Sequence, residues 1–170
     1  MHTTPARIPF WVIIVTMLTV TLHAAVPSAI LDSLSGKAEV RRAGTTGWKT
    51  VQSGTLLQNN DVIRISPDGY GRLQWPDKSV VYMKGGSQIL VTIGPPKSTD
   101  RLLNYATVFM GSVFFVIKKS TPLPRKENIQ IYTPTTVISI RGTSFALEVA
   151  PQTGVTAVKV VCGTAKAAAG

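Results

Sequence analysis

Histidine, the side chain that most often serves acid–base and metal chemistry in proteins, is confined to the start of this chain. His2 and His23 are the two histidines among the 170 residues. If the first 24 residues are removed on export, the remaining chain cannot build a Ser–His–Asp triad, a Cys–His pair or a histidine-containing zinc site. We therefore expect no catalytic histidine, no metal site and no cofactor.

Carboxylates are the remaining acid–base candidates, because a pair of them can act as general acid and base in glycoside hydrolysis. Asp68 lies in a Pro-Asp-Gly turn and Asp77 in a Pro-Asp-Lys turn, where capping by the side chain explains both. Asp61 follows Gln-Asn-Asn at the start of a strand pattern and is expected to fix that loop. No convincing catalytic group is left, so we expect a binding protein and not an enzyme.

Tryptophan and clustered lysine are the candidate binding side chains. Trp48 and Trp75 lie on strand patterns, where filling the core is the usual role and stacking on a sugar is the alternative. The formal net charge of +10 raises nucleic acid or an anionic envelope surface as a partner. One dense basic group surrounds a Pro-containing loop: Lys118, Lys119, Arg125 and Lys126. A solvated loop explains this group, and since no nucleic-acid-binding signature accompanies it, we expect no nucleic-acid partner.

The N-terminal segment has the parts of a secretory signal peptide in their usual order. Arg7 supplies a short basic region, and an uncharged apolar run follows from Phe10 to Leu22. This run has the ~7–15 residues of a signal peptide and not the ~20 of a membrane-spanning helix. We predict a signal helix over residues 1–24 with cleavage after Ala24; the alternative is an uncleaved membrane anchor. In either case the rest of the chain is periplasmic or secreted, with membrane contact only if the segment is retained.

Short runs that alternate apolar and polar residues recur through the rest of the chain, without a sustained helical period. In YGRLQW, for example, Gly71, Leu73 and Trp75 point to one face. This period of two is typical of half-buried strands, and turns rich in Pro and Gly separate the runs. We predict a single all-β domain of about a dozen short strands, either a β-sandwich or a β-helix-like stack. Its expected bounds are residues 36–170, with residues 25–35 as a short lead-in.

Glycine and cysteine give further local predictions. Gly111 is expected to bend the apolar stretch 102–119, and Gly154 to separate the two strands of a C-terminal hairpin. Residues 94–101 are the predicted long loop. Cys162, the single cysteine, lies among valines and a glycine and is expected to be a small buried strand residue.

The stretch TPTTVISIRGTSFALEV (133–149) combines β-branched side chains with one Arg-Gly pair and lacks catalytic groups. Thr133 and Pro134 begin an extended segment, because proline biases its predecessor toward β geometry. Gly142 is expected to supply a bend or bulge between two strands. Arg141 would place its donors on backbone carbonyls or a carboxylate at that bend, or it would bind a partner as an exposed residue.

This stretch, with earlier motifs in the right order, resembles the FecR domain family. GKAEVRR, GWKTVQSGTLLQNNDVIRI, YGRLQWPDKSV and VFMGSVFF are similar to successive elements of the family, over residues 36–161. The resemblance implies a periplasmic β domain of the kind first known from regulators of iron–siderophore signalling. The structural motif comprises Thr133, Pro134, Gly142 and Thr143. The tentative binding residues are Arg141, Trp48, Trp75, Lys118 and Lys119.

Departures from the family pattern limit the functional prediction. Only nine residues precede the apolar run, whereas family members that regulate sigma factors resemble a design with a cytoplasmic segment and one membrane span. Lys78 stands where the family usually has glycine, and VVCGTAKAAAG replaces its acidic ending. We expect a stand-alone, signal-peptide-bearing FecR-like module that contacts an unknown envelope protein through an exposed sheet edge or strand-paired groove. The alternatives are a membrane-anchored signalling component and a protein that binds an anionic cell-wall polymer or other polysaccharide.

Overall fold

The computed structural model describes residues 28–93, 102–118 and 128–169, and the elements in these residues are strands. The strands are β1 (Ala29–Ser35), β2 (Ala38–Arg41), β3 (Trp48–Val51), β4 (Thr55–Leu57), β5 (Val62–Ile65), β6 (Tyr70–Gln74), β7 (Val80–Lys84), β8 (Gln88–Val91), β9 (Leu102–Val116), β10 (Asn128–Tyr132), β11 (Thr136–Val149) and β12 (Thr156–Ala169). The predicted all-β class is confirmed. Over the same ranges, no helix is long and apolar enough to span a membrane. The predicted signal segment and the long loop at 94–101 lie outside the described residues.

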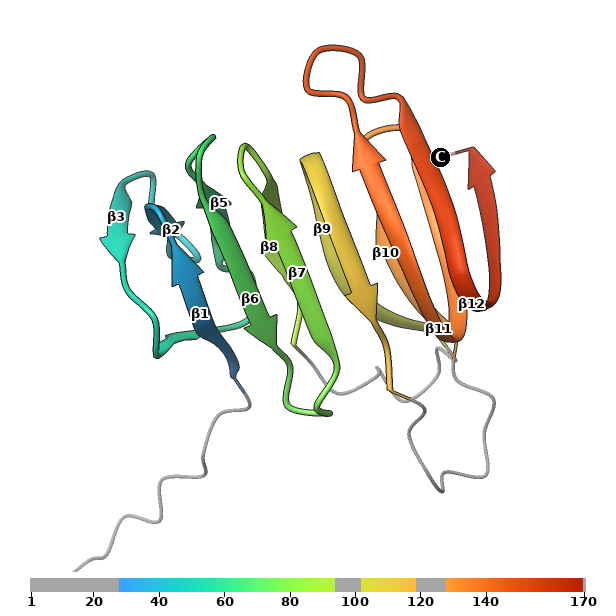
Figure 1. Ribbon diagram of the computed structural model, residues 1–170, viewed down its shortest axis with the longest axis horizontal. Coiled ribbons are helices and arrows are strands. Elements are labelled where there is room, and N and C mark those ends of the chain that lie inside the picture. The colour runs from blue at the N-terminus through green and yellow to red at the C-terminus, as the bar shows by residue number, and fades with distance from the viewer. Residues whose placement is uncertain (1–27, 94–101, 119–127, 170) are drawn as a thin grey trace, which may run out of the picture.

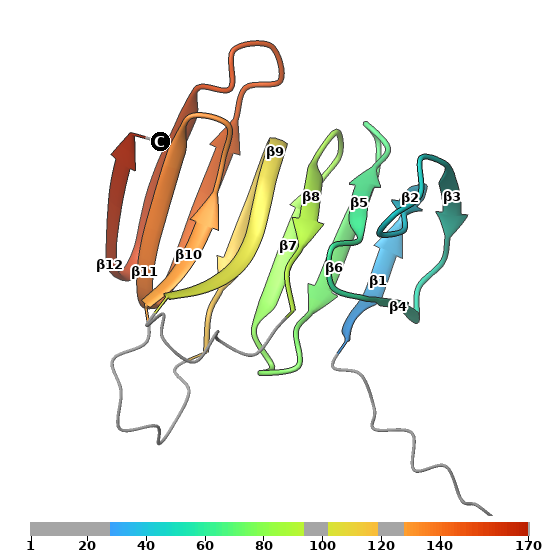
Figure 2. The same ribbon diagram turned by 180° about the vertical axis from the view of Figure 1, so that it is seen from behind.

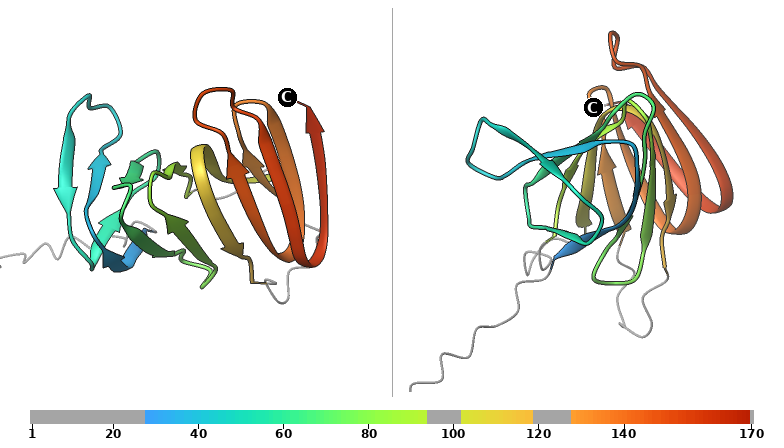
Figure 3. Two further views of the ribbon diagram at one scale, coloured as in Figure 1. Left: turned by 45° about the horizontal axis from the view of Figure 1, so that its top comes forward. Right: turned by 60° about the vertical axis from the view of Figure 1, so that its left-hand side comes forward.

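The twelve strands form one continuous sheet that doubles back on itself into two layers (Figures 1 and 2). One layer follows the order β3-β2-β5-β8 and continues into the first half of β9, which also pairs with β10. The other follows β4-β1-β6-β7 and continues into the second half of β9, which also pairs with β11. β9 therefore belongs to both layers, and the core lies between them (Figure 3, right).

Gly111 allows β9 to pass from one layer to the other, as the sequence predicts. Its φ of +94° is in the left-handed region that favours glycine. A Cβ at this position would lie 2.5 Å from the Cα of Ser87, so the crossing also leaves no room for a side chain. The Ser87 Oγ donates to the carbonyl of Ser112 at 2.9 Å and accepts from its N–H at 3.1 Å, which fixes the crossing against the β7–β8 turn.

Alternating side chains from both layers fill the core, because each strand turns every second residue inward. The period-two prediction holds for Gly71, Leu73 and Trp75, which are all buried. Among the larger contacts, Phe115 of β9 stacks on Phe145 of β11 with ring centroids 4.9 Å apart. Burying each such aromatic ring stabilises the fold by about 1.5–3 kcal/mol.

Three details differ from the sequence predictions. Residues 29–35, expected to form part of a lead-in, are strand β1 and contribute Ala29 and Leu31 to the core. β11 is one strand and not two, with a register shift against β12 between Arg141 and Ser144 at the position of the expected bulge. Cys162 is exposed and not buried, because β12 lies at the end of the sheet.

The backbone at Lys78 explains why glycine suits this turn, and it supports a prediction. Lys78 has a φ of +67°, which costs a residue with a Cβ about 1–2 kcal/mol. We expect Lys78→Gly to raise the free energy of unfolding by about 0.5–1 kcal/mol, after the greater entropy of glycine in the unfolded chain is subtracted. Urea denaturation measures this change. Lys84→Gly within β7 is the matched control and should lower stability, so equal losses in both variants would contradict the strain argument.

Candidate functional site

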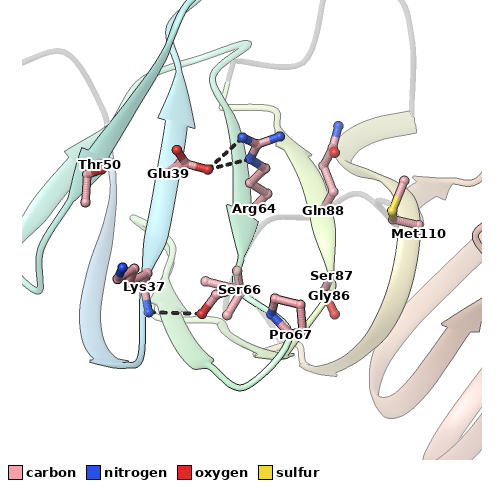
Figure 4. Close-up of a pocket in the computed structure, with 11 residues that line it drawn as sticks. Lys37, Glu39, Thr50, Arg64, Ser66, Pro67, Gly86, Ser87, Gln88 and Met110 are labelled. Carbon is pink, nitrogen blue, oxygen red and sulfur yellow. Dashed lines mark hydrogen bonds and ion pairs between the residues drawn. The ribbon is translucent and has the colours of Figure 1, made fainter.

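A groove of about 610 Å³ lies on the outer face of the layer built from β3, β2, β5, β8 and β9 (Figure 4). The twist of this layer and the flared β2–β3 hairpin, seen in Figure 3 (right), give its outer face a concave form. The groove is lined by side chains of both charges, by a methionine and by the backbone of two tight turns. It is open to solvent, so it suits an extended ligand more than an enclosed small molecule.

A single cross-strand row forms the floor of the groove. The row crosses five strands as directly paired residues: Thr50, Glu39, Arg64, Gln88 and Met110. The side chains of Glu39, Arg64 and Gln88 face outward because their neighbours along each strand face the core, as Ala38 and Val40 do on either side of Glu39. The same alternation that builds the core therefore places a polar row on the opposite face.

Arg64 is the centre of this row, and its guanidinium is held from two sides. Its Nε donates to Glu39 Oε2 at 2.7 Å, and its Nη2 lies 2.7 Å from the same oxygen. The guanidinium lies 4.1 Å from the ring centroid of Trp48, and the guanidinium of Arg41 lies 5.2 Å from that centroid. The Arg64 and Glu39 side chains are 43% and 37% exposed, so the pair is open to exchange with a ligand.

The other end of the groove is rigid backbone. The Lys37 N–H donates to Ser66 Oγ at 3.0 Å, and the Gly86 N–H donates to the Ile65 carbonyl at 3.1 Å. At Gly85 a Cβ would lie 1.9 Å from the carbonyl oxygen of Pro67, so the two turns touch along their main chains. Strand register and turn packing therefore preform the groove, which reduces the entropy that binding would cost.

The two candidate tryptophans have different places. Trp48 is half-buried beside the groove, with its ring under Arg64. Trp75 is only 3% exposed and stacks on Tyr105 with centroids 4.9 Å apart, so it has no face for a sugar. Burial raises the pKa of Tyr105 above its ordinary value, and its protonated hydroxyl donates to Asp77 Oδ1 at 3.2 Å. Trp75 thus belongs to the core and not to a binding surface.

The basic and motif residues lie apart from the groove floor. Lys118 is exposed just after the half of β9 that pairs with β7 and β11, in the other layer. Lys119 lies outside the described residues. Arg141 pairs with Thr164 of β12 through the backbone, and the side chains of Arg141 to Thr143, which include Gly142 of the motif, are not among those described.

Thr133 and Pro134 form the turn between β10 and β11. The Thr133 N–H and hydroxyl both donate to the carbonyl of Thr136, at 2.9 and 3.1 Å. The Thr136 N–H donates back to Thr133 Oγ1 at 3.0 Å, which closes the turn on itself. Pro134 is exposed and lies near Gly154 of the β11–β12 turn. The Thr133 hydroxyl also lies 2.8 Å from Thr156 Oγ1, and the Thr135 hydroxyl donates to the Gly154 carbonyl at 2.7 Å, so the polar groups of this turn bond to the neighbouring β11–β12 connection.

Of the three carboxylates considered for catalysis, Asp61 and Asp77 are occupied by structural bonds, whereas Asp68 is exposed and, among the described residues, does not make the capping bond that the sequence predicts. Asp61 is 1% exposed, pairs with Arg42, and accepts the N–H groups of Ala43 at 3.1 Å and Gln58 at 2.8 Å. Asp77 caps its turn by accepting the N–H and hydroxyl of Ser79, each at 2.9 Å, as the sequence predicts. Within the ranges that the structure describes, no group of three or more His, Cys, Asp or Glu residues could hold a metal ion.

Sequence reasoning missed Arg64 and Glu39 as site residues. Each stands at an ordinary polar position of an alternating strand, and only the antiparallel register of β2 with β5 brings them together. A usable signal was present in their opposite charges on two adjacent strand patterns, since opposite charges are favoured across a strand pair.

Comparison with known proteins gives one result. The family described as FecR protein matches residues 61–166, which is more than half of the chain. No curated protein and no solved structure matches this chain significantly. The matched range runs from the buried Asp61 through the crossing at Gly111 and into β12, so it takes in most of both layers. The chain therefore belongs to the FecR protein family.

Proposed function

We propose that this chain is a non-catalytic, extracytoplasmic binding domain that holds an acidic, extended segment of an envelope protein in the groove. Membership of the FecR family supports the coarser part of this proposal, a signalling-related regulatory domain of the periplasm. The finer part, which concerns the surface and the ligand, depends on the groove itself.

The observation that carries the proposal is the half-exposed Arg64 at the centre of the polar row. Glu39 takes the donors on Nε and Nη2, and a guanidinium has five donors, so Nη1 can serve a second acceptor. A carboxylate from a partner would gain a charge-assisted hydrogen bond there. Lys37 at the end of the groove and the net charge of +10 favour the approach of such a partner.

The open form of the groove supports protein binding over catalysis. Its floor offers one ion pair, one amide and one thioether on a preformed sheet, and these groups suit recognition of an extended chain. The buried Asp61 carboxylate, just before β5, accepts hydrogen bonds from backbone N–H groups and pairs with Arg42. It therefore supplies no free acid or base to the groove.

Two substitutions with opposite expected effects on binding affinity test this proposal. We expect Arg64→Gln to weaken binding about tenfold, the equivalent of about 1.4 kcal/mol, since it removes the charged donor. Glu39→Gln should strengthen binding roughly threefold, because the competing carboxylate is removed and Arg64 is released. Capture from the envelope fraction of the native cells, with the captured protein quantified for each variant, gives the measurement.

Lys84→Gln is the matched control, because it removes one positive charge from an exposed residue of the other layer. If Arg64→Gln and Lys84→Gln reduce capture equally, general charge and not the groove is responsible. If Glu39→Gln weakens capture as Arg64→Gln does, the ligand is not acidic at this position.

An anionic cell-wall polymer is a second candidate ligand, favoured by the half-buried ring of Trp48 close to the guanidinium groups of Arg64 and Arg41. Planar aromatic rings stack on sugars, and arginine binds anionic groups. The same variants, with purified cell wall in place of the envelope fraction, separate the two ligands. Sedimentation with the wall that falls as salt rises and is lost in Arg64→Gln would favour the polymer over the protein partner.

A further inference from the structure

The floor of the groove limits the conformation that a bound peptide segment can adopt. Each strand in the middle of the floor is paired on both sides: β2 lies between β3 and β5, β5 between β2 and β8, and β8 between β5 and β9. A peptide that joins a sheet as a further strand needs an unpaired edge, and this floor has none. A segment bound here must therefore be held through side chains, while water satisfies most of its own backbone groups.

Polyproline II is the regular conformation that meets this requirement. It has no internal hydrogen bonds, and its backbone is fully solvated. It has three residues per turn, so side chains on one face recur every third residue, about 9.3 Å apart. In a β-strand, side chains on one face are instead about 6.7 Å or about 13.4 Å apart. The distance between two recognition points on the floor therefore distinguishes the two conformations.

Arg64 and Met110 are two such points, separated by two strand intervals. Gln88 lies between them in the polar row, paired directly with Arg64 on one side and with Met110 on the other (Figure 4). Neighbouring strands are about 4.8 Å apart, which puts the two positions about 9.6 Å from each other. This separation is close to one turn of polyproline II, and it differs by about 3 Å or more from either same-face interval of a β-strand.

The three side chains offer different chemistry along this line. The guanidinium of Arg64 suits a carboxylate, and the half-buried thioether of Met110 lines the groove and adapts to an apolar side chain. The amide of Gln88 can donate to a main-chain carbonyl of the segment between these two contacts. Glu39 lies on the other side of Arg64 and disfavours a second acidic group there. The charge pattern therefore directs the segment from Arg64 toward Met110.

We propose that the groove binds a polyproline II segment that crosses the strands, with an acidic residue on Arg64 and an apolar residue three positions away on Met110. This inference rests on the proposed function, because it requires Arg64 to bind a carboxylate. It adds the conformation of the ligand, its direction across the sheet and the spacing of its two recognised side chains.

Calorimetric titration of the purified chain with proline-rich peptides tests the spacing. The peptides have equal length and composition, with one glutamate and one leucine placed two, three or four positions apart, and both orders of the two residues are used. We expect the spacing of three to bind about fivefold more tightly than the other spacings in at least one order, since only then do both side chains reach their sites. Replacing the leucine of that peptide with proline should remove the advantage.

Met110→Ala tests the apolar contact. It should weaken binding of the spacing-three peptide about fivefold and leave the peptide without leucine unchanged, so the second peptide also shows that the groove is still folded. Val116→Ala is the matched control, because Val116 is a half-buried apolar residue of the same strand beyond the crossing at Gly111, in the other layer. It should alter neither affinity.

The outcomes separate this inference from the proposed function. Equal affinity at all three spacings, with binding lost in Arg64→Gln, would overturn the polyproline II segment and leave the acidic ligand standing. Equal losses in Met110→Ala and Val116→Ala would overturn the role of Met110. Peptide binding that is unchanged in Arg64→Gln would overturn both proposals. If no peptide bound while capture from the envelope fraction still depended on Arg64, the inference would fail alone.

Discussion

Replacing Asp61 with alanine is expected to lower the free energy of unfolding by about 3 kcal/mol. The carboxylate is 1% exposed and accepts two backbone N–H groups while it pairs with Arg42. Its removal leaves the donors of Ala43 and Gln58 without an acceptor in a buried place, and each such group costs about 1–3 kcal/mol. Arg42 is 39% exposed and can turn to water, which limits the total. Denaturant unfolding followed by tryptophan fluorescence measures the change.

Asp68→Ala is the control for this prediction, because Asp68 is an exposed aspartate in a turn. Surface substitutions of this kind usually change stability by less than about 0.5 kcal/mol. Asp61→Asn should recover part of the loss, since its amide oxygen still accepts one N–H. If Asp61→Ala lowered the free energy of unfolding as little as Asp68→Ala, the buried carboxylate would not be what fixes the loop before β5.

Gly111→Ala should also lower the free energy of unfolding by about 3 kcal/mol, because a backbone cost and a steric cost add together. The left-handed φ of +94° costs a residue with a Cβ about 1–2 kcal/mol. The new Cβ would lie 2.5 Å from Ser87 Cα, and relief of that overlap requires the β7–β8 turn to move at a further cost of about 1–3 kcal/mol. Thermal unfolding by calorimetry measures the loss as a lower melting temperature.

Two other glycines separate these contributions. Gly44 has a similar φ of +73°, but a Cβ added there would have no other atom within 4 Å, so Gly44→Ala should cost only about 1 kcal/mol. Gly47 has open space and no left-handed φ, so Gly47→Ala should be neutral or stabilise slightly. A loss at Gly111 no larger than that at Gly44 would show that the contact with Ser87 is not a constraint.

The strands could be predicted from sequence because their information is local. Gly71, Leu73 and Trp75 alternate with polar neighbours, and this pattern alone places them on one buried face. Gly111 and Gly154 were predictable as bends for a similar reason, since Gly111 interrupts an apolar run, Gly154 lies between two strand patterns, and glycine is the residue that best tolerates φ above zero.

The groove and the end of the sheet depend on information that is not local. Glu39 and Arg64 are 25 residues apart and meet only through the register of two strands. Trp48 and Trp75 have similar strand contexts, yet their burial differs because one lies on an outlying hairpin and the other between the layers. Strand β12 extends to Ala169 through alanines of low β-propensity, because β11 offers it a long paired edge.

β9 has a consequence for how the protein unfolds. It pairs with β7 and β8, which precede it, and with β10 and β11, which follow it. If either group of strands detached, β9 would lose a partner in both layers, and its backbone groups would be exposed on each side of Gly111. Neither half of the chain can therefore melt without disturbing the other, so the doubled sheet is a single cooperative unit despite its elongated shape (Figure 1).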